Sequence, residues 1–224
     1  MVFTMLFLII ENRAAQPMVE PSLFRNRTLA AAGMSASISF ISMFSVMLLM
    51  PYYLENVKGY SPAEVGIILI SIPLVMSLVA PASGWIADKT GSNLLSTIGI
   101  GISCVSLFIL SYLDKLSTPF EITASLALFG FGMGLFQPPN SSIIMSSVPR
   151  ERLGIAAGTM ATMRNLGMVM GVAIGGAVFT NRFVFHNSFV PAFQDTYLIT
   201  ALICCTGIIT SITRGSKIKR EEIR

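Results

Sequence analysis

Charged residues are scarce in this sequence. Lys, Arg, Asp and Glu make up 12% of the 224 residues, whereas a soluble domain is about a quarter charged. Hydrophobic residues make up 53%, and the mean hydropathy is +0.73. A chain of this size has too few polar groups to cover that much apolar surface in water. The composition excludes a soluble globular domain and makes the lipid bilayer the main expected partner.

Histidine and cysteine are also rare. His186 is the single histidine, and the cysteines are Cys104, Cys204 and Cys205. The cysteines lie inside apolar runs, without CxxC spacing or a histidine partner, which argues against a metal site. Serine and threonine are plentiful, but the sequence offers no buried acid or histidine to activate them as nucleophiles. We therefore expect no catalytic residue, no metal, no cofactor and no enzymatic activity.

The apolar residues fall into six runs, each long enough to cross a bilayer, which takes roughly 20 residues. Backbone groups in lipid must be satisfied within the segment, so each run is expected to be a helix. The sequence predicts an all-α, multi-pass transmembrane helical bundle with an N-terminal partial span, residues 1–10. The six expected spans are 29–53, 63–86, 93–113, 120–147, 154–180 and 195–213.

We divide the chain into three parts. Residues 1–28 are expected to be the end of a preceding helix plus a cytoplasmic linker. Residues 29–213 form the six-helix transmembrane domain, and residues 214–224 form a basic cytoplasmic tail. Short connections make neighbouring helices antiparallel; the longest outer loop is expected at 181–194, with its phenylalanines at the lipid interface.

The net charge of +4 does not indicate a nucleic-acid partner, because the basic residues form no basic face with interleaved aromatics. Basic residues instead mark the cytoplasmic side of a membrane protein. Assigning alternate loops to opposite sides puts eleven on one side and three on the other, with Arg164 inside a span. The larger set is Arg13, Arg25, Arg27, Lys89, Arg150, Arg152, Arg214, Lys217, Lys219, Arg220 and Arg224; the smaller is Lys58, Lys115 and Arg182. We expect a plasma-membrane protein with a cytoplasmic C-terminus.

The turn after the second span holds two glycines around an acid and a base: Gly84, Asp88, Lys89 and Gly91. Glycine permits a tight reversal of the backbone. Asp88 can cap the next helix, or it can pair with a cation on a neighbouring helix and act as a conformational latch. The alternative is an ordinary polar turn with a weak surface ion pair.

Polar residues and prolines interrupt two later spans. Proline removes a backbone donor and kinks a helix, and broken helices often line transport cavities. A charge inside a span is costly, so Arg164 faces a cavity or an acid, or else its side chain extends to the cytoplasmic surface. The candidate cavity or hinge residues are Gln137, Pro138, Pro139, Asn140, Arg164 and Asn165. We expect Gln137, Asn140, Ser141 and Ser142 to satisfy the freed carbonyls.

Glycines recur at spacings of four in the fifth span, which lets a neighbouring helix approach closely. The candidate packing residues are Gly154, Gly158, Gly167, Gly171 and Gly175. Acids, in contrast, are missing from the interior of every expected span. Proton coupling usually needs a buried carboxylate, so the chain offers no relay of its own, with Glu64 a partial candidate.

Five motifs carry a resemblance to a known family. Gly84–Gly91 is similar to the G-x-x-A-D-[KR]-x-G loop of the major facilitator superfamily. The others resemble the C-terminal half of a fourteen-helix drug:proton antiporter of the EmrB/QacA type. These are Pro21–Arg27, Tyr60–Gly66, Val148–Arg152 followed by Gly154 and Gly158, and Arg164–Gly167 with Gly171.

The resemblance implies proton-coupled efflux of drugs or other amphipathic small molecules by one half of a carrier. Such a chain needs a missing N-terminal half or a second copy as its partner. In the resembled family the coupling acids lie mainly in the N-terminal half. The alternative is a non-transporting truncated fragment or a membrane scaffold.

Overall fold

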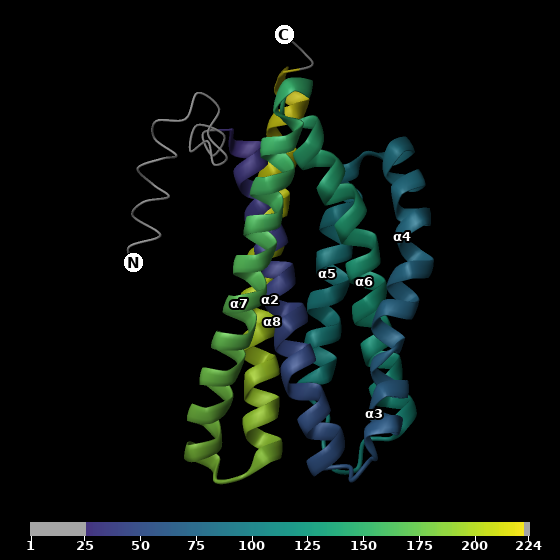
Figure 1. The fold of residues 1–224 in the computed structure, drawn as a ribbon, viewed down its shortest axis with the longest axis vertical. Helices are drawn as coiled ribbons and strands as arrows, with labels where there is room; N and C mark the ends of the chain where they lie inside the picture. The colour runs from purple at the N-terminus through teal and green to yellow at the C-terminus, as the bar shows by residue number, and fades with distance from the viewer. Residues whose placement is uncertain (1–25, 222–224) are drawn as a thin grey trace.

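The computed structural model describes residues 26–221 and confirms the predicted all-helical bundle (Figure 1). Within that range, six helical stretches are long and apolar enough to cross a membrane. The chain is therefore an integral membrane protein. The elements are α2 (Arg27–Asn56), α3 (Pro62–Leu69), α4 (Ser71–Thr90), α5 (Ser92–Leu110), α6 (Pro119–Ser146), η2 (Arg150–Arg152), α7 (Leu153–His186) and α8 (Phe189–Glu221).

Two helices, α3 and α6, begin with a capping box at the lower end of the bundle in Figure 1. Ser61 accepts a hydrogen bond from the backbone of Glu64, and the Glu64 carboxylate accepts one from the backbone of Ser61. Thr118 and Glu121 make the same reciprocal pair at the start of α6. A proline in the first turn follows each cap, where its missing N–H costs nothing.

The second predicted span is two helices, because α3 ends at Leu69 and α4 begins at Ser71. Pro73 has no N–H to donate to the carbonyl of Leu69, so the regular hydrogen-bond ladder stops at this point. Pro73 instead lies in the first turn of α4, where proline is tolerated. The two helices together still form one stretch, Pro62–Thr90, that is long and apolar enough to cross a membrane.

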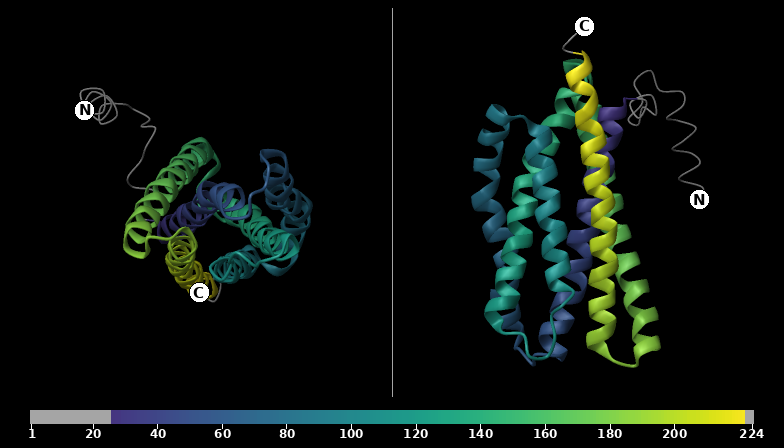
Figure 2. Two further views of the ribbon diagram at one scale, coloured as in Figure 1. Left: turned by 90° about the horizontal axis from the view of Figure 1, so that it is seen from below. Right: turned by 180° about the vertical axis from the view of Figure 1, so that it is seen from behind.

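The helices form two groups of three. One group is α2 with α7 and α8, and the other is α6 with α4 and α5; contacts between α5 and α8 and between α2 and α6 join the groups. The start of α2, the α4–α5 connection, η2 and the end of α8 lie at the upper end (Figure 1). The α2–α3, α5–α6 and α7–α8 connections lie at the lower end. Seen along the helices, α2 is recessed between α4 and α7 (Figure 2).

The prediction of a long outer loop at 181–194 is wrong, because α7 continues to His186 and α8 begins at Phe189. Asp195 explains how the charges of this segment fit into helices. Its carboxylate lies 2.9 Å from His186 Nε2 and 3.5 Å from Arg182 Nε, so the polar residues pair across the turn. Asn187 closes the turn with a positive φ of 48°, the left-handed conformation that ends many helices.

The expectation that all the phenylalanines here lie at the lipid interface is also wrong. Phe193 is fully buried and stacks on Tyr53 of α2, with ring centroids 4.6 Å apart. Residues 1–25, which hold the expected partial span and most of the linker, lie outside the described residues. At the other end, α8 continues past residue 213, where the transmembrane domain was expected to stop.

Candidate transport face

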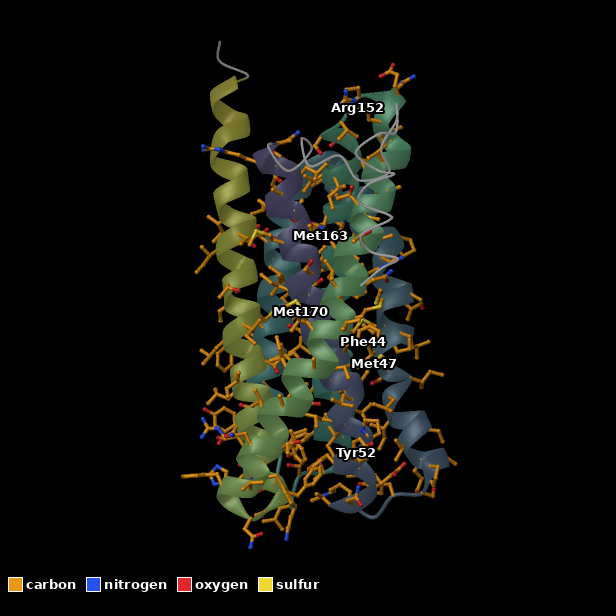
Figure 3. All side chains as sticks on the ribbon, turned by 60° about the vertical axis from the view of Figure 1, so that its left-hand side comes forward. Phe44, Met47, Tyr52, Arg152, Met163 and Met170 are labelled. Atoms are coloured by element: carbon orange, nitrogen blue, oxygen red, sulfur yellow. The ribbon has the colours of Figure 1, made fainter. Side chains whose placement is uncertain are left out.

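Two of the six spans are poorly covered by the rest of the bundle. The most apolar windows of the α3–α4 span and of α7 are 22% and 11% buried, against 61% for α2. Large apolar side chains are exposed along them, including Leu74 and Leu78 on α4 and Val169 and Met170 on α7. Figure 3 shows Phe44, Met47 and Tyr52 of α2 between these helices. We call this side of the bundle, formed by α4, α2 and α7, the open face.

Three of the predicted cavity residues meet beside the open face. Gln137 and Asn140 of α6 and Arg164 of α7 line a small cavity of about 40 Å³, together with Ala36 and Phe40 of α2. Asn140 is buried and donates a 3.2 Å hydrogen bond to the carbonyl of Ala32. The Arg164 guanidinium is exposed and lies 5.9 Å from the centroid of the Phe40 ring, within the range of a cation–π contact.

Pro138 and Pro139 lie inside a continuous α6. Pro138 cannot donate to the carbonyl of Gly134, and the Ser83 hydroxyl of α4 donates to that oxygen instead, at 2.8 Å. We expected residues of α6 itself to satisfy the freed carbonyls, and for Gly134 that expectation is wrong. The donor comes from a neighbouring helix, so the proline ties α4 to α6.

The predicted packing glycines divide into two sets. A methyl group at Gly167 or Gly171 would lie 2.5 or 2.6 Å from a backbone oxygen of α2, and one at Gly175 would lie 2.9 Å from Ser45 Oγ. At Gly154 and Gly158, an added methyl group meets no described atom within 4 Å. Three of the five glycines therefore bring α7 against α2, while the two nearest the upper end face open space.

Serines on α2 complete this contact, and the sequence analysis did not identify them. Ser37 donates a hydrogen bond to the carbonyl of Met163 at 2.8 Å, and Ser45 donates to that of Gly171 at 3.1 Å. The signal was present in the sequence, because Ser37, Ile41 and Ser45 repeat with the spacing of the glycines. This repeat on α2 becomes informative only when it is compared with the glycine repeat on α7.

The Gly84–Gly91 segment lies at the upper end, and the expectation that it forms a turn is wrong for all but its last residue: Gly84 to Thr90 are the last turns of α4, and Gly91 ends the helix. Its charged residues are exposed. Gly91 has a φ of 95°, in the left-handed region that favours glycine. Lys89 lies over the Trp85 ring, 3.6 Å from its centroid. The α5 helix begins without a side-chain cap, so Asp88 does not cap it; within the described chain, Asp88 also has no ion pair.

Acidic groups stay near the ends of the helices throughout residues 26–221. None of the carboxylates in that range lies more than two turns inside a span. The same range contains no group of three metal-ligating side chains. Cys104 and Cys205 do meet, with 3.0 Å between their sulfur atoms, which brings α5 to α8.

This arrangement of apolar helices around one open, partly polar face defines a multi-pass membrane protein. Residues 9–172 match the Major Facilitator Superfamily, and the chain belongs to that family. The riboflavin transporter RibZ of Clostridioides difficile is 28% identical over 219 residues, which cover 95% of this chain and 48% of RibZ. The uncharacterized transporter YebQ of Escherichia coli is 31% identical over 86% of this chain and 42% of YebQ.

The multidrug resistance protein Stp of Mycobacterium tuberculosis is 29% identical over 77% of this chain and 32% of Stp. The chain thus spans less than half the length of these curated relatives. The relatives are named as transporters or resistance proteins, and the family indicates a transport protein rather than an enzyme.

Proposed function

We propose that this chain forms one half of a carrier that exports drugs or other amphipathic small molecules in exchange for protons. Its open face would be covered by a second six-helix half, either an N-terminal half or a second copy. The fourteen-helix EmrB/QacA type fits best, because the four motifs that resemble that type run from Pro21 to Gly171. Relatives named for multidrug and methyl viologen resistance support this substrate class.

The exposed Arg164 on the open face is the observation that carries the proposal. Arg164 is the twelfth residue of α7, roughly 16 Å below the start of the helix at 1.5 Å per residue. A guanidinium at such a depth is costly in lipid, so it needs a water-filled cavity or a polar partner. The amides of Gln137 and Asn140 lie beside it, which supports a polar transport path between two halves.

The second half would also supply the coupling acid, because the described spans hold no carboxylate in their interior. In this arrangement the two halves rock around a site near the middle of the membrane. The upper end, with Lys89 and Arg150, would face the cytoplasm, and the C-terminus with it. The Gly84–Gly91 segment at the end of α4 would then meet the other half and act as the conformational latch.

The test is ethidium efflux from pump-deficient cells that express the chain alone or together with the first half of RibZ. Membrane insertion and co-purification of the halves are checked by blot, and a protonophore is the control. Protonophore-sensitive efflux in either case is the expected result. No efflux from inserted and co-purifying halves would overturn the proposal in favour of a non-transporting fragment or scaffold.

Arg164→Ala sharpens the test. We expect it to lower the efflux rate at least tenfold without lowering insertion, a change of about 1.4 kcal/mol in the transport barrier. Arg182→Ala is the matched control, because it removes an arginine from the lower end of the same helix. Equal efflux from the Arg164 variant and the wild type would mean that the guanidinium only extends to the membrane surface.

A further inference from the structure

A second cavity lies away from the open face, at the lower end between α5 and α6. Its volume is about 650 Å³. One wall is Ile109 of α5 and Tyr112 of the turn that follows, and the other is Phe120, Ala124 and Leu128 of α6. Tyr112 and Phe120 are each 80% exposed. Because these apolar side chains stand at the ends of membrane spans, the cavity opens toward lipid.

The floor of this cavity is the turn between α5 and α6, and three side chains from other elements hold it in place. The Tyr53 hydroxyl of α2 donates to the carbonyl of Asp114. Lys58 Nζ donates to the carbonyls of Lys115 and Ser117, and Gln194 of α8 donates to that of Leu113. The turn is therefore fixed before any ligand arrives, which reduces the ordering cost of binding.

Two carboxylates of the cavity each use one oxygen in the local fold. Asp114 Oδ1 accepts from the backbone N–H groups of Leu116 and Ser117 and from the Ser117 hydroxyl. Glu121 Oε2 accepts from the backbone of Thr118. Within the described part of the chain, Asp114 Oδ2 and Glu121 Oε1 have no hydrogen-bond donor. The hydrogen bonds from Leu116 and Ser117 lower the pKa of the Asp114 carboxyl below its usual value, so it stays ionised.

We propose that this cavity binds phosphatidylethanolamine, with the ammonium head group between Asp114 and Glu121 and one acyl chain along Ile109, Ala124 and Leu128. Charge complementarity selects the head group, because the cavity wall holds two acids and no base. The exposed Lys115 follows Asp114 and suits the lipid phosphate. The apolar groove runs from the acids along the helices toward the middle of the bundle, as an acyl chain runs from its head group toward the middle of the bilayer.

Titration of the purified full chain in detergent micelles tests this proposal by native mass spectrometry. Dioleoyl phosphatidylethanolamine, phosphatidylcholine and phosphatidylglycerol are added separately. We expect half-saturation with phosphatidylethanolamine at about a tenfold lower concentration than with phosphatidylcholine, because choline has no N–H to donate to the carboxylates. Equal affinity for the three lipids, or a preference for phosphatidylglycerol, would overturn the proposal.

The variant Asp114→Asn/Glu121→Gln removes both charges but keeps acceptor oxygens for the local hydrogen bonds. It should bind phosphatidylethanolamine and phosphatidylcholine equally. Glu64→Gln is the matched control, because Glu64 occupies the same capping position in α3, outside this cavity. This control should keep the full preference for phosphatidylethanolamine over phosphatidylcholine. Loss of that preference in the control would overturn the assignment to this cavity.

Ala124→Trp provides a second variant that leaves both carboxylates intact and fills the groove instead. It should weaken retention of phosphatidylethanolamine about tenfold, and unchanged retention would contradict the proposed position of the acyl chain. Ethidium is the probe for a different occupant. If ethidium binds the wild type and not the double variant, while the lipids show no preference, the cavity takes amphipathic cations and not a lipid.

Discussion

Two pairs of helices approach each other closely through glycines. The glycines lie on the less buried helix in one pair and on the more buried helix in the other. In the α2–α7 pair, Gly167 and Gly171 lie on the poorly buried helix, against the backbone of α2. In the α4–α6 pair, the glycines lie on the well-buried helix, where a methyl group at Gly130 would lie 2.5 Å from the carbonyl oxygen of Ile72. Both pairs flank the open face, so both set its width.

A serine hydroxyl crosses each contact to a backbone carbonyl, but the two carbonyls are not equivalent. The carbonyl of Gly171 also accepts the ordinary helical hydrogen bond from Gly175, so the bond from Ser45 is an addition. The carbonyl of Gly134 has lost its helical donor to Pro138, so Ser83 is a replacement. The two pairs therefore share close packing at glycines, but only the α4–α6 pair needs its serine hydrogen bond to satisfy a carbonyl that has lost its helical donor.

The largest effects are expected from Gly171→Ala and Gly130→Ala. Each added methyl group meets a backbone atom, which a side-chain rotation cannot relieve, so the helices must separate. We expect each variant to lose roughly 1–3 kcal/mol of unfolding free energy, measured by titration with sodium dodecyl sulfate in mixed micelles. Gly158→Ala, in open space, is the control and should be neutral or slightly stabilising. A large loss in only one pair would show that the two contacts are not alike.

Much of this fold was predictable from the sequence, because lipid leaves helices as the only structure for long apolar runs. The junction of α7 and α8 was not, because Arg182 and His186 are unfavourable until Asp195 pairs with them across the turn. Pairing of this kind depends on which residues become neighbours. Apolar content and local charge do not encode it.

The candidate site was predictable only in its residue types. A glycine repeat identifies one helix face but not the helix that packs there, which is why Gly158 and Gly171 looked equivalent. Similarly, the prolines of α6 indicated a missing donor, but Ser83 lies 51 residues away from the carbonyl that needs it. Both contacts depend on how each helix is rotated and on which helix lies beside it. Neither can be read from the sequence of a single span.

A smaller and unequal effect is expected from the serines. Ser83→Ala leaves the Gly134 carbonyl without its donor and should cost about 1–2 kcal/mol of unfolding free energy. Ser45→Ala should cost only about 0.6 kcal/mol, a typical value for a hydrogen bond between membrane helices. Equal losses would contradict the distinction between replacement and addition.

A double-mutant cycle sharpens this distinction. Pro138→Ala restores an N–H that can donate to Gly134, so Ser83→Ala should cost less in that background than in the wild type. The coupling free energy should be about 1 kcal/mol by the same titration. Additive losses would show that Ser83 does not substitute for the missing helical donor.

The smallest effect is expected at Thr159 on α7, and it has the opposite sign. The hydroxyl of Thr159 is buried, and within the described chain it has no hydrogen-bond partner. It lies one turn above Met163, where the contact between α2 and α7 opens toward Gly158. Thr159→Val removes this uncompensated polar group and should raise the unfolding free energy by about 0.5 kcal/mol. A destabilised variant would contradict this, since it would mean that the hydroxyl has a donor or acceptor in the membrane, and that the α2–α7 contact extends further up than the glycines indicate.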